Sequence, residues 1–448
     1  MRFLEISCLL FCLLAILSLG SQYPKLQKGL LTLSVVALAL HLGIEGWRWQ
    51  MVPVYVAISL LIFMTIRQTE VSGMLIGSKI AVLMLLSVPL FMLPIPSYPE
   101  LSGAASVGTD SFDVVDNERG RVLPTKVWFP IDKPTLTKTA ELQSAPWLEH
   151  QEKIGPVLAR IAAMPGFIFN HLRHFKNGYK SDLKLAVAND KPLIVLSHGR
   201  GGIKEMNGFM AMEFASQGYI VIAPDHTKGA MYTVLQNGSE IPFDPKEFAE
   251  GENLPDPEYD QRIRELGQRW VQDLAVVTSY VQQEIPELAN KQVISGGHST
   301  GGGTAIEFCN QDARCIGAIG LDAWMLPIAE ETLDELNKPL LSFFGDSRLE
   351  YFEPINRERF VRLQQASNKK QVLNKEFVIA NANHIDFCDA GLLSPYSYLF
   401  GQDKGKIKTQ RVMQIINQHS ITFAEAIRNN AADKITWQHF PEEMNWGE

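Results

Sequence analysis

The stretch that decides the fold is Gln292–Ile306, QVISGGHSTGGGTAI. In it an apolar run is followed by Gly297-His298-Ser299-Thr300-Gly301 and then by small residues that lead into a helical pattern. A Gly-x-Ser-x-Gly sequence at a strand-to-helix turn is typical of a nucleophilic serine, because glycines let the chain turn sharply and leave the hydroxyl clear of the sheet. The three fixed positions alone are a weak signal, and the strand and helix around them carry the interpretation.

Short apolar runs alternate with helical patterns on both sides of this turn. Several runs are apolar on both faces, as parallel strands buried between helices should be. The helical patterns include Asn207–Gln217 and Arg262–Gln283, the second with an apolar face at spacings of three and four. This alternation predicts an open, mostly parallel, doubly wound α/β sheet. The expected strands are Lys126–Phe129, Leu193–Ser197, Tyr219–Ala223, Gln292–Ser295, Ile316–Leu321, Leu340–Phe344 and Phe377–Ala380.

A serine hydroxyl needs a base that takes its proton, and the base needs a carboxylate that fixes its tautomer. In the α/β-hydrolase fold the chain order is serine, acid, histidine. Three histidines follow Ser299: His384, His419 and His439. Only His384 directly follows an expected strand, and loops at the carboxyl ends of strands build the site of such a sheet. We therefore predict His384 as the base.

Two residues are candidates for the acid. Asp322 ends the expected strand Ile316–Leu321, and Asp346 ends the strand Leu340–Phe344. Many α/β hydrolases place the acid after the later of these strands, but the neighbours of Asp346, Gly345 and Ser347, also fit an ordinary turn. Spacing alone leaves both possibilities open.

An ester intermediate also needs two backbone N–H groups that stabilise its oxyanion. One is expected from Thr300, the residue after the nucleophile. The other is expected from the loop His198-Gly199-Arg200-Gly201-Gly202, which follows the strand Leu193–Ser197. Arg200 N–H is the predicted second donor.

Residues 1–98 differ in composition from the rest of the chain. They contain six Lys/Arg and three acidic residues, and four stretches without charge: Ile6–Pro24, Gly29–Ile44, Trp49–Ile66 and Ile80–Pro99. Their lengths are 19, 16, 18 and 20 residues, and a membrane-spanning helix needs about 20. We expect a membrane anchor of three to four transmembrane helices, in which the second stretch is marginal. The first could instead be a cleaved signal peptide.

The charges that flank these stretches predict an orientation. With four spans, Lys25, Lys28, Arg67 and Lys79 lie on one side and Arg2 and Arg48 on the other. The positive-inside rule then places the N-terminus and the second domain outside the cytoplasm. Residues 99–111 are the expected linker, within a stretch rich in Pro, Gly and Ser, and 112–448 the expected catalytic domain.

Charge and cysteine content exclude other classes of protein. The chain carries a net charge of −8, of which −11 falls on residues 99–448, so a nucleic-acid partner is not expected. Five cysteines without a Cys-x-x-Cys pair predict neither a zinc site nor a redox dithiol. His384, Asp386 and Cys388 are a weak alternative as metal ligands, and no metal or cofactor is predicted. Cys309 and Cys315 could form a disulfide if the domain is extracytoplasmic.

The catalytic domain resembles the platelet-activating factor acetylhydrolases, also called lipoprotein-associated phospholipase A2, from about residue 112 to the early 390s. The matching motifs are RVLPTKVWFP, PLIVLSHGRGG, GYIVIAPDH, GHSTGG, GLDAWM and His384-x-x-Phe387-x-Asp389. The resemblance implies Ser299 as nucleophile, His384 as base and Asp322 as acid. It implies Arg200 and Thr300 as oxyanion donors.

The resemblance also implies calcium-independent hydrolysis of the sn-2 ester of phospholipids with short or oxidised acyl chains. This sequence departs from the animal members at Arg200 and Thr300, where apolar residues are usual, in the Thr-Lys that follows Asp225-His226, and in its four apolar stretches. Two alternatives are a general short-chain carboxylesterase and a non-catalytic hydrolase fold used for binding. The segment Trp147–Phe175, with a helical apolar stripe, is expected either to pack in the core or to form a lid or an interfacial helix that touches lipid.

Overall fold

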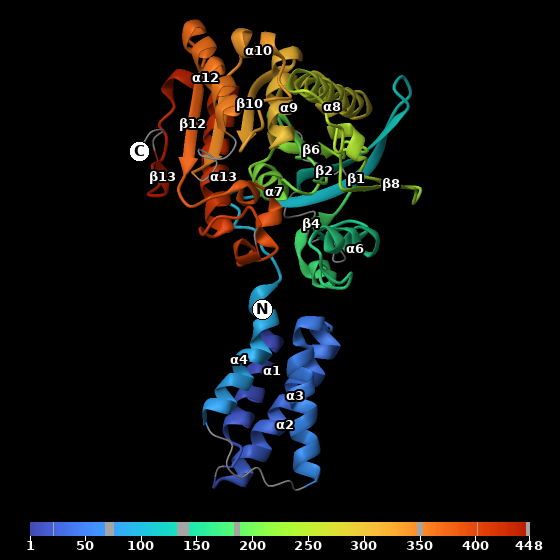
Figure 1. The fold of residues 1–448 in the computed structure, drawn as a ribbon, viewed down its shortest axis with the longest axis vertical. Coiled ribbons are helices and arrows are strands. Elements are labelled where there is room, and N and C mark those ends of the chain that lie inside the picture. Colours follow the sequence, from blue (N-terminus) through green and yellow to red (C-terminus); the bar gives the residue numbers. More distant parts are fainter. Residues whose placement is uncertain are drawn as a thin grey trace.

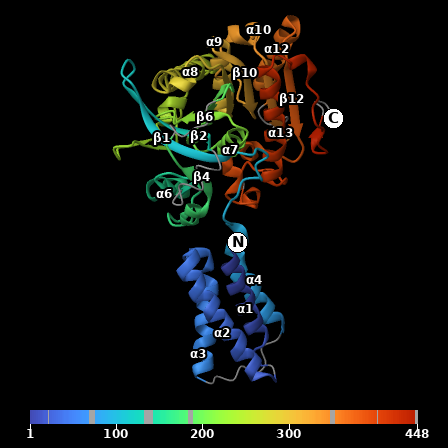
Figure 2. The ribbon, with the colours of Figure 1, turned by 180° about the vertical axis from the view of Figure 1, so that it is seen from behind.

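The computed structural model describes residues 1–20, 22–67, 76–131, 143–182, 189–346, 353–400 and 402–444. Figure 1 shows a bundle of N-terminal helices (blue) and an α/β domain, which are joined by the chain that follows α4. The view from behind shows the same arrangement (Figure 2). The bundle helices are α1 (Phe3–Leu17), α2 (Pro24–Leu40), α3 (Val52–Ile66) and α4 (Ile76–Met92), with the short helices η1 (His41–Glu45) and η2 (Trp49–Met51) between α2 and α3.

The bundle is apolar on its inside and on its outside. Cys8, Cys12, Val54 and Ile58 are buried in its centre. Large apolar side chains also cover its outer surface, among them Leu10, Val36, Leu60, Phe63 and Leu85. A helix that is apolar all round suits a protein core or a bilayer rather than an aqueous surface.

The third expected span is found with its predicted bounds, and the other three differ in length from the expectation. Two continuous helices in the described residues are long and apolar enough to cross a membrane: Pro24–Glu45 with 22 residues and Trp49–Ile66 with 18. The second stretch, expected to be marginal, is the longer because the π-helix η1 extends α2 through Gly43. The first, expected over Ile6–Pro24, forms only the 15-residue helix α1. The fourth, expected to end at Pro99, stops at Met92, because Pro94 disfavours helix in the residue before it.

Hydrogen bonds join one end of the bundle to the α/β domain. Trp49 Nε1 donates to the Ile168 carbonyl at 2.9 Å, and Ser394 Oγ donates to the Met92 carbonyl at 2.7 Å. The Trp49 and Phe167 rings meet edge to face, with centroids 5.7 Å apart. The bundle therefore contacts the segment Trp147–Phe175.

The α/β domain is built on an 11-stranded sheet with the order β13-β12-β11-β10-β9-β5-β6-β2-β1-β4-β3. The run from β12 to β6 is parallel, which confirms the predicted mostly parallel sheet. The strands are β1 (Ser106–Asp116), β2 (Arg121–Ile131), β3 (Ser144–Pro146), β4 (Lys176–Lys180), β5 (Leu193–Ser197), β6 (Ile220–Pro224), β9 (Val293–His298), β10 (Cys315–Leu321), β11 (Leu340–Gly345), β12 (Asn374–Ile379) and β13 (Glu443–Met444). A separate hairpin pairs β7 (Tyr232–Val234) with β8 (Glu240–Pro242).

Helices cover both faces of this sheet. On one face Ile194 and Leu196 of β5 pack with α7 (Gly208–Ser216) and α13 (Thr409–Arg428). On the other face Leu193 and Val195 pack with α8 (Asp256–Glu284), α9 (Thr300–Gln311) and α12 (Glu353–Lys370). Alternate residues of one strand thus enter two cores, as the strand period of two requires. The described residues also form α6 (Gln151–Ile161) and α10 (Glu330–Glu335).

The α/β domain begins earlier than expected, with a strand that the sequence did not predict. β1 starts at Ser106, inside the range 99–111 that we expected to be a linker, and pairs with β2 over eleven residues. The linker is correspondingly shorter. The antiparallel β1–β2 pair places a long ribbon at the end of the parallel run, next to β6.

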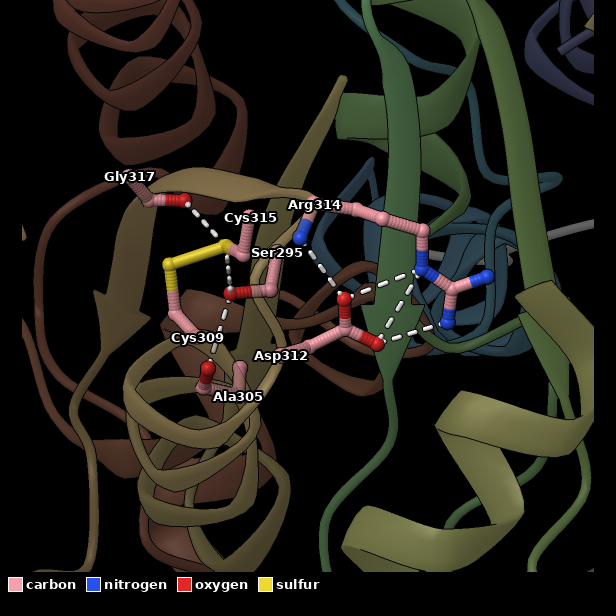
Figure 3. Close-up of a disulfide and its surroundings, with 7 residues drawn as sticks. All are labelled: Ser295, Ala305, Cys309, Asp312, Arg314, Cys315 and Gly317. Atoms are coloured by element: carbon pink, nitrogen blue, oxygen red, sulfur yellow. Dashed lines mark hydrogen bonds and ion pairs between the residues drawn. A yellow bond between two sulfur atoms is a disulfide. The ribbon is translucent and has the colours of Figure 1, made fainter. Parts of the chain in front are cut away.

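A disulfide joins Cys309 and Cys315 (Figure 3). It links the C-terminal turn of α9 to the first residue of β10. Next to it, Ser295 Oγ donates to the Ala305 carbonyl at 2.8 Å, which ties β9 to α9. The disulfide that the sequence allowed is therefore formed, in a chain whose described cysteines otherwise remain free.

Candidate active site

Ser299 lies at the sharp turn between β9 and α9. Its φ of +56° and ψ of −123° are unusual for a residue with a side chain. Hydrogen bonds to the backbone N–H and carbonyl of Ser299 hold the turn in this conformation. Ser299 N donates to the Leu321 carbonyl at 3.0 Å, and Trp324 N donates to the Ser299 carbonyl at 2.9 Å. Strained turns of this kind persist only where the surroundings fix them.

Two glycines make this turn possible. A Cβ at Gly297 would lie 2.3 Å from the Gly301 carbonyl oxygen, and a Cβ at Gly301 would lie 2.3 Å from the carbonyl oxygens of Ser197 and His198. Neither position can hold a larger residue without a backbone shift. The two glycines of the Gly-x-Ser-x-Gly sequence therefore serve the close packing that the motif predicts.

Asp322 and His384 come together beside this turn. Asp322 follows β10, and His384 begins the short helix η7 (His384–Phe387) that follows β12. His384 Nδ1 lies 2.5 Å from Asp322 Oδ2, and the Asp322 side chain is 1% exposed. Because a carboxylate can only accept, Nδ1 carries the proton, which leaves Nε2 free to take another.

A second histidine connects His384 to the serine turn. His298 Nε2 donates to the His384 carbonyl at 3.0 Å, and the two rings lie 4.3 Å apart between centroids. His298 is the residue immediately before Ser299. The predicted nucleophile, base and acid thus lie on three neighbouring loops at the carboxyl ends of the strands.

Asp346, the other candidate acid, has a different partner. Its Oδ2 accepts a hydrogen bond from Asn381 N at 2.7 Å, and its own N–H lies 3.4 Å from the Ile379 carbonyl. The side chain thereby closes the loop that follows β12. The structure brings Asp322, and not Asp346, to the imidazole.

The loop His198–Gly202 lies against the serine. A Cβ at Gly199 would lie 3.0 Å from Ser299 Cβ. Gly201 N and Gly202 N donate to the carbonyls of Gly229 and Gly199. Within the described ranges, no protein group accepts from the N–H groups of Arg200 and Thr300. Thr300 is also the first residue of α9, where the helix dipole favours negative charge. Both N–H groups that the sequence suggested are therefore available to an oxyanion.

The Arg200 side chain points to other partners. Its guanidinium pairs with the Glu250 carboxylate and lies 5.3 Å from the centre of the Phe248 ring. About half of the side chain is exposed. Only its backbone N–H is therefore directed toward the predicted oxyanion role.

The loop that carries His384 is anchored by buried charge. Asp386 accepts from Lys404 Nζ at 2.9 Å and from Thr409 Oγ1 at 2.6 Å. The Asp386 oxygens also accept from Gly405 N at 2.7 Å, and His384 Nδ1 is engaged by Asp322. The weak alternative of a metal bound by His384, Asp386 and Cys388 does not fit these partners. Sequence reasoning missed this anchor because Lys404 and Thr409 belong to no motif.

Asp389 joins the same loop to more distant segments. Its Oδ2 accepts from Tyr98 Oη at 2.6 Å and from Trp147 Nε1 at 2.8 Å, and its Oδ1 accepts from Phe209 N at 3.2 Å. Burial raises the pKa of this carboxyl to about 7. Through Asp389 the chain that leaves the bundle contacts the loop that carries His384.

The described residues contain one group of potential metal ligands outside this region. Glu5, His41 and Glu45 approach one another at the end of the bundle. Arg48 Nε and Nη2 donate to both oxygens of Glu5 at 2.6 and 2.9 Å, and Arg2 also pairs with Glu5. The charge of Glu5 is therefore already balanced by arginine.

Comparison with known proteins identifies the family. Residues 94–445 match the family model described as platelet-activating factor acetylhydrolase, isoform II. The chain belongs to the platelet-activating factor acetylhydrolase family. It is 25% identical over 357 residues to the platelet-activating factor acetylhydrolase of Cavia porcellus, covering 73% of this chain and 77% of that protein. It is 26% identical to the Bos taurus protein of the same name over 52% of this chain and 56% of that protein.

A solved structure supports the fold. The ferulic acid esterase from Streptomyces cinnamoneus matches with a TM-score of 0.56 and 19% identity, over 74% of this chain and 92% of that one. This likeness shows an α/β-hydrolase-type fold. Together with the family assignment, it supports an ester hydrolase as the general class of the protein.

We expect Asp322→Asn and Asp346→Asn to differ sharply. The first should lower kcat for an aryl acetate by about 10⁴-fold, because an asparagine favours the wrong tautomer of His384. The second is a matched control at the end of the next strand and should leave kcat close to that of the wild-type protein. Steady-state kinetics of both variants measure the difference, and a larger loss in Asp346→Asn would contradict the assignment of Asp322.

Proposed function

We propose that this chain is a membrane-anchored serine ester hydrolase that cleaves the sn-2 ester of phospholipids with short or oxidised acyl chains. The observation that carries the proposal is the 2.5 Å contact between His384 Nδ1 and Asp322 Oδ2, next to a serine held in a strained turn. Ser299, His384 or Asp322 alone would be weak evidence for a hydrolytic site. Together they supply a nucleophile, a base of fixed tautomer and a buried carboxylate.

In the proposed reaction, Ser299 Oγ attacks the acyl carbonyl while His384 Nε2 takes the hydroxyl proton. The N–H groups of Arg200 and Thr300 stabilise the oxyanion that forms. When the bond to the leaving alcohol breaks, His384 delivers the proton to it and an acyl-enzyme remains. Water then attacks the acyl-enzyme, gives its proton to His384 and releases the free acid, and the proton returns to Ser299. No cofactor takes part.

The segment Trp147–Phe175 supports a lipid substrate. Its inner side belongs to the core, where Trp147 and Leu172 are fully buried. Its outer side exposes Ile161, Met164 and Phe167 close to the end of the bundle that Trp49 contacts. The buried residues fit the expectation of core packing, and we propose that the exposed ones touch lipid. An exposed apolar surface next to an anchor suits a substrate that lies in the bilayer.

The orientation proposed from the sequence is in line with the arrangement of the bundle. In Figure 1 the N-terminus and the end of α4 lie at the end of the bundle next to the α/β domain. Arg2 and Arg48 belong to this end, and the C-terminal ends of α1 and α3 lie at the other. The disulfide Cys309–Cys315 is typical of an oxidising compartment. We therefore propose a catalytic domain outside the cytoplasm.

Acyl-chain preference separates the proposed substrate from the alternative of a general short-chain carboxylesterase. The full chain in detergent micelles should hydrolyse 1-alkyl-2-acetyl glycerophosphocholine at least about tenfold faster than the 2-palmitoyl compound, because a pocket for a short chain excludes a long one. Free fatty acid release measures both rates. Equal rates on the two phospholipids contradict the short-chain proposal, and cleavage of aryl acetates alone favours the general esterase.

Reporter fusions test the orientation. A reporter that is active only in the cytoplasm, fused after Glu448, should give no signal, whereas one that is active only outside should give a strong one. The same reporters fused after Arg67 of a truncated chain provide the control and should show the reverse pattern. A cytoplasmic signal from the Glu448 fusion would overturn the proposed orientation.

A further inference from the structure

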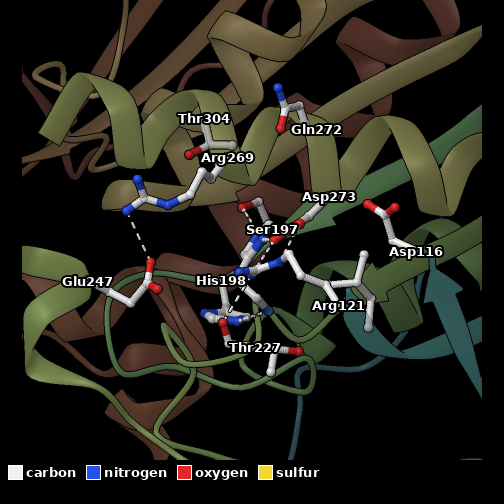
Figure 4. Close-up of polar contacts among 12 residues, drawn as sticks. Asp116, Arg121, Ser197, His198, Thr227, Glu247, Arg269, Gln272, Asp273 and Thr304 are labelled. Atoms are coloured by element: carbon white, nitrogen blue, oxygen red, sulfur yellow. Dashed lines mark hydrogen bonds and ion pairs between the residues drawn. The ribbon is translucent and has the colours of Figure 1, made fainter. Parts of the chain in front are cut away.

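A second serine–histidine–aspartate array lies buried beside the candidate active site. Ser197 Oγ lies 2.8 Å from His226 Nε2, and His226 Nδ1 lies 3.0 Å from Asp273 Oδ2. The three residues end β5, follow β6 and lie within α8, respectively. Figure 4 shows Ser197, His198 and Asp273 gathered beneath α8, with Arg121 beside them. All three members of the array have an exposed fraction of 0%, so no ester can reach the Ser197 hydroxyl.

We propose that this array positions the oxyanion loop His198–Gly202, and with it the N–H group of Arg200. The inference rests on the proposed function, since it assigns a role in stabilising the oxyanion of that reaction. His226 and Ser197 are positioning residues in this scheme, because they touch the loop and not the substrate.

The protonation states of the array are fixed by its surroundings. Burial lowers the pKa of His226 to about 4, so the ring is neutral at pH 7. Burial alone would raise the pKa of Asp273, but the hydrogen bond from His226 and the nearby charges of Arg121 and Arg119 lower it. His226 therefore donates from Nδ1 to Asp273 and accepts at Nε2 from the Ser197 hydroxyl.

Arginine holds the aspartate in place. Arg121 Nε and Nη2 lie 3.1 and 2.9 Å from the two carboxylate oxygens of Asp273, and Arg119 Nη1 lies 2.9 Å from Oδ1. Arg121 Nη2 also donates to the Thr227 carbonyl at 3.0 Å. The paired guanidinium thus fixes both Asp273 and the residue after His226.

Hydrogen bonds lead from His226 into the oxyanion loop. His226 N donates to His198 Nε2 at 3.0 Å, and His198 Nδ1 donates to the Gly199 carbonyl at 2.7 Å. Trp270 packs against both imidazoles: its ring stacks on His226 at 4.0 Å and 5°, and meets His198 edge-on at 5.3 Å. The shared contact with Trp270 adds to the hydrogen bond that links the two histidines. The Gly199 carbonyl and the Arg200 N–H belong to the same peptide group. The bond from His198 to this carbonyl therefore also fixes the direction of the Arg200 N–H.

The strand end that Ser197 fixes also contacts the serine turn. Asn207 Nδ2 donates to the Ser197 carbonyl at 3.0 Å, while the Ser197 side chain is held by His226. The Ser197 carbonyl packs so closely on Gly301 that a Cβ there would lie 2.3 Å away. A shift of this strand end would change the distance between the N–H groups of Arg200 and Thr300. Oxyanion stabilisation depends on that distance.

Ser197→Ala and His226→Phe test the inference. Ser197→Ala deletes one hydroxyl, and His226→Phe keeps a ring against Trp270 but removes both nitrogens. Ser295→Ala is the matched control, because Ser295 is also 0% exposed, lies in the adjacent strand β9 and bonds a backbone carbonyl. If His226→Phe does not fold, Ser197→Ala carries the test alone.

Three readouts on the full chain separate positioning from general destabilisation. We expect Ser197→Ala to lower kcat for an aryl acetate about tenfold, less than the 10²–10³-fold loss that removal of an oxyanion donor causes, with KM changed less than about twofold. The Ki of a trifluoromethyl ketone, which forms an oxyanion on the serine, should rise by the same factor as kcat falls. The Ki of the matching alcohol should stay unchanged, and Ser295→Ala should match the wild-type protein in every readout.

Several results would overturn the inference. Ser197→Ala could retain the wild-type kcat, lose no more than Ser295→Ala, or lose kcat without weaker binding of the ketone. Any of these means that the array does not act through the oxyanion loop. Failure of the proposed function is distinct, because there the wild-type protein itself would neither hydrolyse the ester nor bind the ketone more tightly than the alcohol.

Discussion

The close approach of two backbone segments at Ser299 is the constraint on which the rest of the site depends. The end of β5 and the start of α9 pack so tightly that only glycine fits at positions 297 and 301. This contact forces Ser299 into its left-handed conformation and brings the loop after β5 against the serine. It also explains why β5 and β9 must be neighbours in the sheet. A side chain at either glycine would separate the oxyanion donors from the hydroxyl.

Much of this arrangement could be predicted from local sequence. The buried strands are continuous apolar runs, and the seven expected strands lie within strands of the structure apart from single residues at their ends. The turn at Ser299 carries its own signal, because its glycines are required by sterics. His384 could be selected because it directly follows an expected strand. The sequence does not predict β1, since the polar residues Thr109, Asp110 and Ser111 interrupt its apolar pattern.

Other features depend on contacts between distant residues. Asp322 and Asp346 follow neighbouring parallel strands, so spacing alone could not decide which of them is the acid. The structure distinguishes them because His384 Nδ1 contacts Asp322. The array of Ser197, His226 and Asp273 joins residues 29 and 47 positions apart and belongs to no motif. It has the same chemical groups as the candidate active site. What separates the two is exposure: the Ser197 array is fully buried, whereas Ser299 and His384 are partly exposed.

Labelling with a fluorophosphonate probe tests the central claim most directly, because the probe reacts with a serine only where a base, an oxyanion site and access to solvent occur together. After labelling of the full chain, mass spectrometry of its peptides locates the modified residue. The account predicts labelling of Ser299, no labelling of Ser197, and loss of the label in Ser299→Ala. A wild-type protein that does not react, a label on Ser197, or equal labelling of Ser299→Ala would contradict it.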